Sequence, residues 1–454
     1  MDVAIIGTGY VGLTTGACLA FLGHTVVCVD SDPEKIATLL RGESPFYEPY
    51  MRELMDAARP HLRFTSSYAE AIPTAQVIFI AVGTPPGAGG APDLQFLKDA
   101  AHSVGGLLGN HFTVVVNKST VPIGSGNWVG LLVRDATASR NGGSAGARFA
   151  VASNPEFLRE GSAIRDSLYP DRVVVGTDER ETAEVLYSLH RPILDQTFQA
   201  PSFMPRPDGL GAIPLISTDL ASAELIKYAA NAFLALKISY INEVGRLSER
   251  VGADISQVAK GIGLDARIGM RFLQAGIGWG GSCFGKDTAA LVATAQEYGL
   301  QMPIVTAARE VNRGQRERVV EKLQAELKIL KGRTIGLLGL AFKPLTDDLR
   351  EAPALDIARK LIERGARVKA HDPVAMDRFK KEYPDLEVVL CPTPEEAAQD
   401  ADALVLVTEW PEYRELDWDR LGAGMRSRIL LDGRQAVDPK RMAQFGFRCL
   451  GFAG

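Results

Sequence analysis

Residues 2–12 have the sequence Asp-Val-Ala-Ile-Ile-Gly-Thr-Gly-Tyr-Val-Gly, and the fold of the chain can be worked out from them. The apolar start predicts a short buried strand, and a GxGxxG pattern follows it directly at Gly7, Gly9 and Gly12. A helix pattern of small residues comes next, and a second apolar strand, residues 26–29, ends in Asp30. This order of strand, glycine turn, helix, strand and acid is typical of a dinucleotide-binding fold, because the glycines let a pyrophosphate approach the helix N-terminus.

The acid at the end of the second strand bears on which dinucleotide binds. Asp30 lies 18 residues after Gly12, where a carboxylate can accept a hydrogen bond from a ribose 2′-hydroxyl. The same carboxylate repels a 2′-phosphate, so we predict NAD rather than NADP. Tyr10 and Val11 lie between the glycines and belong to the predicted cofactor site. Lys35 is predicted to help hold the adenosine half, with an exposed helix lysine as the alternative.

Three further apolar strands end in polar motifs. They cover residues 77–82, 113–116 and 149–152. Because ligands bind at the carboxyl ends of the strands in an open parallel sheet, we predict that polar side chains after these strands lie near the ligand. They are Thr84, Thr120, Glu156 and Glu160. The alternatives are ordinary turn residues for the two threonines and a solvated face for the two glutamates.

The middle of the chain contains one long helix pattern. Residues 199–217 are rich in proline and glycine and predict a connection or an insertion, and an amphipathic pattern runs from 219 to 250. Lys227 and Asn231 are at i and i+4 in it, about 6 Å apart along a helix axis at 1.5 Å rise per residue. Together they could stabilise an oxyanion, although such a pair on a helix is more often incidental. A helix of this length can connect domains and form a dimer interface.

A glycine-rich stretch, Gly-Trp-Gly-Gly-Ser-Cys-Phe-Gly-Lys-Asp at 278–287, contains a single cysteine. Apolar residues at helical spacing follow it, so Cys283 is predicted to lie near a helix N-terminus, where the helix dipole favours a thiolate. Asp287 is four residues further and shares that helix face. A thiolate beside a carboxylate suggests a nucleophile and a base. The alternative is a glycine turn with a small buried cysteine.

The last third predicts a second alternation of strands and helices. It contains no GxGxxG pattern, so we expect it to bind something other than a second dinucleotide. Lys343, Arg350 and Arg434 follow strand ends and would suit phosphates, or are surface cations. The predicted fold class is α/β, with two Rossmann-like doubly wound domains joined by a helical central domain with one long connecting helix. The predicted domains are 1–210, 211–327 and 328–454.

Composition excludes several classes of protein. Lys and Arg number 50 against 55 Asp and Glu, which leaves no basic field for nucleic acid or a membrane surface. No apolar run reaches the roughly 18 residues that a membrane span needs. The five cysteines are scattered, without a CxxC pair or a metal-ligand spacing. We therefore expect a reduced, cytoplasmic enzyme without a metal. Residues 142–146 predict a flexible surface loop.

Seven segments, in order, resemble the UDP-glucose/GDP-mannose dehydrogenase family over essentially the whole chain. They are GTGYVG (7–12), VGTP (82–85), KSTVPIGS (118–125), NPEFLREGSAIRD (154–166), ELIKYAANAFLALKISYINEV (224–244), GWGGSCFGKD (278–287) and LGLAFKPLTDDLRE (338–351). The segment 267–284 is most similar to the members that act on UDP-glucose. The resemblance implies UDP-glucose as the substrate, NAD as the cofactor and a homodimer built on the long helix.

The resemblance also implies a mechanism in which NAD oxidises the sugar C6 alcohol twice. Cys283 would form a thiohemiacetal and then a thioester, which water hydrolyses. Lys227 and Asn231 would stabilise the oxyanions, Asp287 would act as base or orient the water, and Thr120 with Glu156 would complete the water site. Residues implied to touch NAD are Glu160, Lys286 and Arg350. Residues implied to line the nucleotide-sugar site are Phe157, Leu158, Arg159, Phe272, Leu273, Gly276, Gly280, Lys343 and Arg434, with Arg267 reaching UDP across the dimer interface.

Three features depart from the family's pattern. Trp279 stands where Phe or Tyr is expected, and Gly285 stands where Pro is common and would loosen the turn after the nucleophile. The region 199–213 is longer than expected, as if an added loop covered the site or the interface. Three other readings stay open: a dehydrogenase of GDP-mannose or a UDP-N-acetylhexosamine, a β-hydroxyacid dehydrogenase without a nucleophilic cysteine, and an NAD-responsive binding protein without activity.

Overall fold

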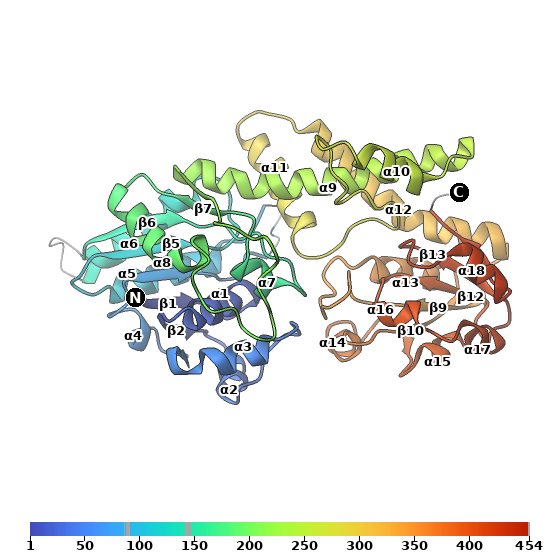
Figure 1. Ribbon diagram of the computed structural model, residues 1–454, viewed down its shortest axis with the longest axis horizontal. Helices are drawn as coiled ribbons and strands as arrows, with labels where there is room; N and C mark the ends of the chain where they lie inside the picture. Colours follow the sequence, from blue (N-terminus) through green and yellow to red (C-terminus); the bar gives the residue numbers. More distant parts are fainter. Residues whose placement is uncertain (86, 88–90, 141–146, 453–454) are drawn as a thin grey trace. The chain divides into compact units, whose positions relative to one another are not determined.

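The computed structural model describes residues 1–85, 87, 91–140 and 147–452, so the loop predicted at 142–146 lies outside the described residues (Figure 1). The chain forms two compact units. The first contains Met1–Ala229 and Ala289–Tyr298, and the second contains Ala230–Thr288 and Gly299–Gly454. The predicted division into three domains at residues 210 and 327 stays a prediction.

The first unit is built around an eight-stranded sheet with the strand order β3-β2-β1-β4-β5-β6-β7-β8. Its strands are β1 (Asp2–Ile6), β2 (Thr25–Val29), β3 (Leu62–Thr65), β4 (Val77–Ile80), β5 (Thr113–Asn117), β6 (Phe149–Ser153), β7 (Val173–Gly176) and β8 (Leu215–Thr218). Neighbours pair in parallel except β6 and β7, which meet at one antiparallel pair. The order 3-2-1-4-5-6 is that of a dinucleotide-binding sheet, so the doubly wound α/β prediction is confirmed here.

Helices cover both faces of this sheet because its strands are apolar on both faces. In β5, Val114 and Val116 belong to one buried core and Val115 belongs to the other. The helices of this unit are α1 (Tyr10–Phe21), α2 (Pro33–Leu40), α3 (Met51–Ala58), η1 (Arg59–His61), α4 (Tyr68–Ala71), α5 (Gln95–Leu107), α6 (Ser125–Arg140), α7 (Ala163–Leu168) and α8 (Arg180–Leu194). Such two-sided burial is typical of parallel sheets.

The proline-rich region before the long helix belongs to the core of the first unit. Phe203 stacks on Tyr50 at 5.8 Å, and the Tyr169 hydroxyl donates a hydrogen bond to the Met204 carbonyl. Ile213 is buried in the same core. The predicted connection 199–217 was too long at its end, because residues from 215 onward pair with β7 as β8.

Long helices and a second parallel sheet make up the rest of the chain. The helices are α9 (Leu220–Val251), α10 (Ile255–Gly263), α11 (Phe284–Glu297), α12 (Pro303–Leu327), α13 (Pro353–Glu363), α14 (Met376–Glu382), α15 (Pro394–Ala398), α16 (Pro411–Arg414), α17 (Trp418–Ala423) and α18 (Pro439–Gln444). The strands are β9 (Thr334–Leu338), β10 (Arg367–His371), β11 (Val388–Leu390), β12 (Ala403–Leu406), β13 (Ile429–Asp432) and β14 (Arg448–Leu450). Their order, β11-β10-β9-β12-β13-β14, repeats that of the first sheet.

The turn after β9 is held by a buried carboxylate. Asp372, at the end of β10, is fully buried and accepts hydrogen bonds from the main-chain N–H groups of Leu340 and Ala341 at 2.7 and 3.0 Å. The indole of Trp410 donates to the same carboxylate oxygen. Leu340 lies two residues after β9, as Thr8 lies two residues after β1, and Thr8 N donates in the same way to Asp30 after β2. A carboxylate after the second strand therefore holds the glycine turn in both sheets.

The described residues contain no candidate membrane span and no candidate metal cluster. None of their helices combines the length and the apolar character that crossing a bilayer requires. Among the same residues, no group of three or more His, Cys, Asp or Glu side chains is placed to hold a metal ion.

Candidate active site

The glycine turn after β1 forms an open cradle. Gly7 has a φ of +98°, and a Cβ on Gly7 or on Gly12 would overlap main-chain atoms of the neighbouring turn. A Cβ on Gly9 would instead meet no atom within 4 Å. Two glycines are thus required by close packing, and the third leaves open space at the N-terminus of α1. This arrangement fits the pyrophosphate of a dinucleotide.

Asp30 is fixed at the edge of this cradle. Its Oδ2 accepts hydrogen bonds from the Thr8 main chain and hydroxyl, both at 2.8 Å, and its Oδ1 accepts one from Asp32 N. Burial favours the neutral form of Asp30, but these hydrogen bonds outweigh it, so the pKa of the carboxyl lies below its usual value. Lys35 Nζ stands 3.7 Å away with its side chain 42% exposed. The ionised carboxylate can accept a hydrogen bond from a hydroxyl, and its predicted role on the ribose stays a prediction.

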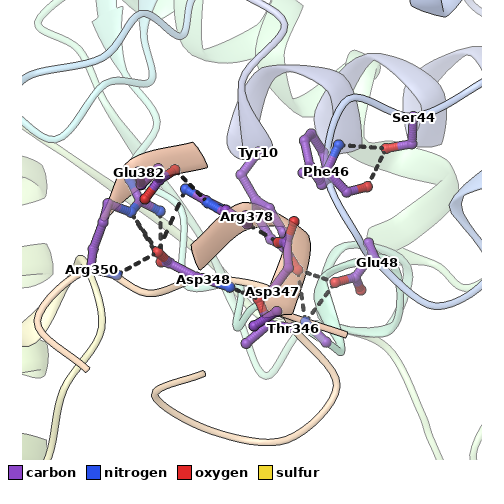
Figure 2. Close-up of polar contacts among 12 residues, drawn as sticks. Tyr10, Ser44, Phe46, Glu48, Thr346, Asp347, Asp348, Arg350, Arg378 and Glu382 are labelled. Atoms are coloured by element: carbon purple, nitrogen blue, oxygen red, sulfur yellow. Dashed lines mark hydrogen bonds and ion pairs between the residues drawn. The ribbon is translucent and has the colours of Figure 1, made fainter. Parts of the chain in front are cut away.

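Tyr10 is held by a carboxylate that sequence reasoning missed. Its ring packs on Phe46 at 4.7 Å, and its hydroxyl donates to the buried Glu48 (Figure 2). Glu48 also accepts hydrogen bonds from the main-chain N–H groups of Gly161 and Ala163 at 2.6 and 2.7 Å. Burial and the nearby Glu48 raise the pKa of Tyr10 far above its usual value. Glu48 therefore joins the glycine turn to the loop that follows Glu160.

The strand ends of β4 and β5 meet, as the sequence predicts. The Thr84 hydroxyl donates a 2.8 Å hydrogen bond to the Thr120 carbonyl. The turn after Thr120 is held in place by Glu224 of α9, whose carboxylate accepts from Gly124 N and Gly126 N at 2.6 and 2.8 Å. Burial raises the pKa of Glu224 to about 7. No sequence signal marked Glu224, because its partners lie about 100 residues away.

Lys227 and Glu156 form a buried ion pair. Lys227 Nζ is 2.7 Å from Glu156 Oε1, and each side chain is only 5% exposed. The other oxygen of Glu156 accepts a 2.9 Å hydrogen bond from Leu158 N. Phe157 lies between two cations, with the Arg172 guanidinium 3.6 Å and Lys227 Nζ 5.6 Å from its ring centre. Two residues that were predicted separately as catalytic, Lys227 and Glu156, are thus in direct contact.

A second lysine, Lys118, stands behind this pair and was not predicted. Its Nζ donates to the side chain and the carbonyl of Asn154 at 2.8 and 3.2 Å. Burial lowers the pKa of Lys118 to about 8, while the charge of Glu156 opposes that shift and the charge of Lys227 adds to it. Lys118, Asn154, Glu156 and Phe157 line one cavity of about 90 Å³. Lys118 and Lys227 are two cations against the one anion, Glu156, and this excess of positive charge favours a developing negative charge.

In the second unit, Cys283 directly precedes the first residue of α11, as predicted from the helical spacing. Its carbonyl accepts a 2.8 Å hydrogen bond from Asp287 N in the first turn of that helix. The Asp287 carboxylate is 1% exposed and accepts a 2.6 Å hydrogen bond from Asn231 Nδ2. Cys283 is partly exposed, whereas Cys18, Cys28 and Cys391 are buried. The structure thus brings together the predicted amide and carboxylate in the turn that follows the thiol.

The glycines before Cys283 are required by the protein's own packing. A Cβ on Gly276 or Gly280 would overlap the carbonyl of Gly433 or of Glu351, and a Cβ on Gly281 would press on the Phe342 ring at 2.6 Å. At these three glycines the bare backbone therefore faces the protein's own chain.

The two departures near the cysteine have structural consequences. Trp279 is buried, and its indole N–H donates to the Ser239 hydroxyl at 3.1 Å. Gly285 lies in the first turn of α11, where a Cβ would overlap the carboxylate of Glu351. The turn after Cys283 is helical, and a larger residue at 285 would require the flexible Glu351 carboxylate to move.

The predicted phosphate-binding cations differ in their surroundings. Arg434 is held by three main-chain carbonyls, those of Val407, Gly278 and Phe342, at 2.7, 2.9 and 3.3 Å. Arg350 Nε and Nη2 donate hydrogen bonds to the Asp348 carboxylate, and Arg378 lies beside the same carboxylate (Figure 2). Half of the Arg350 side chain remains exposed, so it can face a ligand more readily than Arg434.

The remaining predicted residues fall into three environments. Leu273 is buried in a small apolar cluster, and Phe272 packs on Phe284 at 6.3 Å. Arg159 and Arg267 are surface cations bound to Asp166 and Asp265. Val11, Leu158, Lys286 and Lys343 are partly buried and Glu160 is buried. None of these positions tests a binding role, so the roles stay predictions.

Comparison with known protein families decides the class of the protein. Residues 1–194 match the NAD binding domain of the UDP-glucose/GDP-mannose dehydrogenase family, residues 221–314 its central domain and residues 336–439 its UDP binding domain. The chain belongs to this family. It is an NAD-dependent nucleotide-sugar dehydrogenase, and the second sheet carries the family's UDP binding domain.

Individual relatives extend over the whole chain. The UDP-glucose 6-dehydrogenase TuaD of Bacillus subtilis is 44% identical, over 98% of this chain and 91% of its own. A UDP-glucose 6-dehydrogenase of Pseudomonas aeruginosa is also 44% identical, over 98% of this chain and 96% of its own. The solved structure of a UDP-glucose dehydrogenase from Pyrobaculum islandicum has a TM-score of 0.87 at 37% identity and covers all of this chain and 97% of its own.

Proposed function

We propose that this chain oxidises UDP-glucose to UDP-glucuronate in two successive NAD-dependent steps, through a thioester on Cys283. The observation that carries the proposal is the position of Cys283 at the start of α11, one turn before an Asp287 that is bonded to Asn231. A single alcohol oxidation needs no nucleophilic thiol, whereas a four-electron oxidation uses one to hold the aldehyde. The relatives described above as UDP-glucose 6-dehydrogenases support the choice of sugar.

The glycine turn and its neighbours would hold the cofactor. The space at Gly9 accepts the pyrophosphate, and Asp30 accepts the hydrogen bond of a ribose hydroxyl. Bound NAD⁺ supplies the hydride acceptor in each oxidation. Tyr10, Thr84, Thr120 and Glu160 complete this site, with Lys35, Lys286 and Arg350 as further contacts.

Cys283 carries the sugar between the two oxidations. The alcohol carbon first loses a hydride and a proton and becomes an aldehyde. The Cys283 thiolate then adds to the aldehyde carbon, and the resulting oxyanion takes up a proton to give a thiohemiacetal. Loss of a second hydride and a proton gives a thioester. Water then breaks the carbon–sulfur bond and releases the carboxylate, the thiolate and two protons.

The buried polar groups have roles that match these charges. Lys227 stabilises the alkoxide and the tetrahedral oxyanions, since its ammonium is held in place by Glu156 at 2.7 Å. Asn231 shares this role through its amide. Asp287 is the base or orients the hydrolytic water, and Thr120 with Glu156 completes the water site. The UDP moiety is bound by the domain at 336–439, where Lys343 and Arg434 suit its phosphates.

We also propose a homodimer through α9. Three large apolar side chains repeat every seven residues on this helix, at Phe233, Tyr240 and Leu247, and each is more than half exposed. Residues seven apart lie on one face of a helix, so they form a continuous apolar stripe. A second copy of the chain, with the same stripe, is the partner that buries it. The role of Arg267 across such an interface is part of this proposal.

Ligand-induced thermal stabilisation tests the substrate. UDP-glucose, GDP-mannose and a small hydroxyacid are each added with NAD⁺, and the unfolding temperature is measured against NAD⁺ alone. A ligand at 100 times its Kd stabilises by about 2.7 kcal/mol, so binding of the correct sugar is readily seen. We expect UDP-glucose to give the largest rise. A larger rise with GDP-mannose would assign the chain to the sister activity, and a rise only with the hydroxyacid would overturn the proposal.

A further inference from the structure

The segment from Gly276 to Gly281, which leads to Cys283, contains no helix or strand and is held mainly by other parts of the second unit. Gly276 N donates to Asn242 Oδ1 at 2.7 Å, and its carbonyl accepts from Gln315 at 2.6 Å. Ile277 N donates to the Gly433 carbonyl at 3.0 Å. The position of the cysteine therefore depends on distant side chains rather than on local secondary structure.

One face of α12 supplies most of the side chains that hold this segment. Asn312 is 3% exposed and binds both main-chain polar groups of Trp279. Trp279 N donates to Asn312 Oδ1 at 2.7 Å, and Asn312 Nδ2 donates to the Trp279 carbonyl at 3.0 Å. Arg316, one turn further, donates to the same carbonyl at 3.1 Å. Arg309, one turn earlier, donates to the Gly285 carbonyl at 2.7 Å. Residues three and four apart share a helix face, so these contacts come from one rigid surface.

These contacts lie on both sides of the cysteine. Trp279 is four residues before Cys283, and Gly285 is two residues after it. The backbone also approaches Asn312 very closely at Gly278, which has a φ of +89° and where a Cβ would overlap the Asn312 side chain. A glycine at 278 and an amide at 312 are therefore matched in shape as well as in hydrogen bonding.

We propose that Asn312 is a positioning residue that holds Cys283 in place through the main chain of Trp279. The proposal rests on the proposed function for its catalytic consequence, because it assumes that the Cys283 thiol reacts with the sugar aldehyde. A nucleophile displaced by about 1 Å can lose on the order of 100-fold in rate. A loosened thiol also lets the aldehyde leave before it is captured.

The test compares Asn312→Ala with Arg313→Ala, a control at the next, exposed position of the same helix. Hydrogen exchange of the peptides that cover 276–285 is measured first, without ligands. We expect the Trp279 amide to exchange about tenfold faster in Asn312→Ala, with the rest of the second unit unchanged and the control like the wild type. Asn312→Asp keeps the acceptor for Trp279 N and should show a smaller effect.

Kinetics then distinguishes positioning from a purely structural role. Per folded molecule, we expect kcat of Asn312→Ala to fall about 10- to 100-fold with the KM for NAD within threefold, and the NADH formed per sugar to fall below two. Three results would each overturn the proposal. They are unchanged exchange in Asn312→Ala, faster exchange over the whole second unit in both variants, and a local increase in exchange with unchanged kcat and stoichiometry. If the wild type does not oxidise UDP-glucose, the proposed function fails, and the exchange result alone decides whether Asn312 holds the segment.

Discussion

Replacing Asp287 by asparagine separates the chemistry of this residue from its structural role. Asp287 accepts a 2.6 Å hydrogen bond from Asn231 Nδ2, and the two side chains are 1% and 8% exposed. An asparagine at 287 keeps an oxygen in that position, so Asp287→Asn loses only the charge-assisted part of the bond, about 1 kcal/mol. A general base contributes roughly 100- to 10,000-fold to the rate. We therefore expect a large fall in kcat with little loss of stability.

The assay follows NADH formation with UDP-glucose and the thermal unfolding of each protein. A loss of about 1 kcal/mol corresponds to roughly 2–4 °C in a unit of this size. Asp254→Asn is the matched control, because Asp254 caps α10 from the surface and asparagine caps equally well. A kcat of Asp287→Asn within threefold of the wild type would refute the assignment. A fall in unfolding temperature above about 10 °C would show that folding, not chemistry, accounts for any lost activity.

Three further changes test other parts of the account. Burial lowers the pKa of Lys118 from 10.5 to about 8, so the unfolded chain binds more protons than the folded chain between these values. Wild-type stability should therefore gain up to about 3 kcal/mol relative to Lys118→Met as the pH rises through that window, measured by urea unfolding; a constant difference would contradict this. Gly285→Ala would place a Cβ on the Glu351 carboxylate, the end of a flexible exposed side chain that can move aside, so the free energy of unfolding measured by calorimetry should change by less than about 1 kcal/mol; a loss above about 3 kcal/mol would show that Glu351 is fixed there. Leu247→Glu should reduce the mass measured by light scattering from that of the dimer, twice 48.9 kDa, to that of the monomer, 48.9 kDa. An unchanged mass would place the interface elsewhere.

The sequence was sufficient for features that depend on local pattern. The strand–turn–helix at residues 2–21, the parallel strands that follow and the helix that starts after Cys283 all have periodicities or glycine spacings that dictate them. The Lys227 and Asn231 pair could be placed on one helix for the same reason. The structure adds the partners of these two residues, Glu156 and Asp287.

The features that the sequence could not supply depend on contacts between distant segments. Lys118 meets Asn154 at a separation of 36 residues, and Glu48 meets Gly161 at 113. Asn312 is one of three amide side chains in α12, and nothing in the sequence marks it until its contact with Trp279 is seen. Glycine is ambiguous in the same way, because a bare backbone can face open space, as at Gly9, or the protein's own chain.

The central claim is that one sugar is oxidised twice through a covalent bond to Cys283. The direct measurement is the NADH formed per UDP-glucose consumed, with the reaction run to completion in the wild type and in Cys283→Ala. The account predicts two NADH per sugar in the wild type and one or none in the variant. One NADH per sugar in both proteins would contradict it, because the chain would then be a simple alcohol dehydrogenase with a structural cysteine.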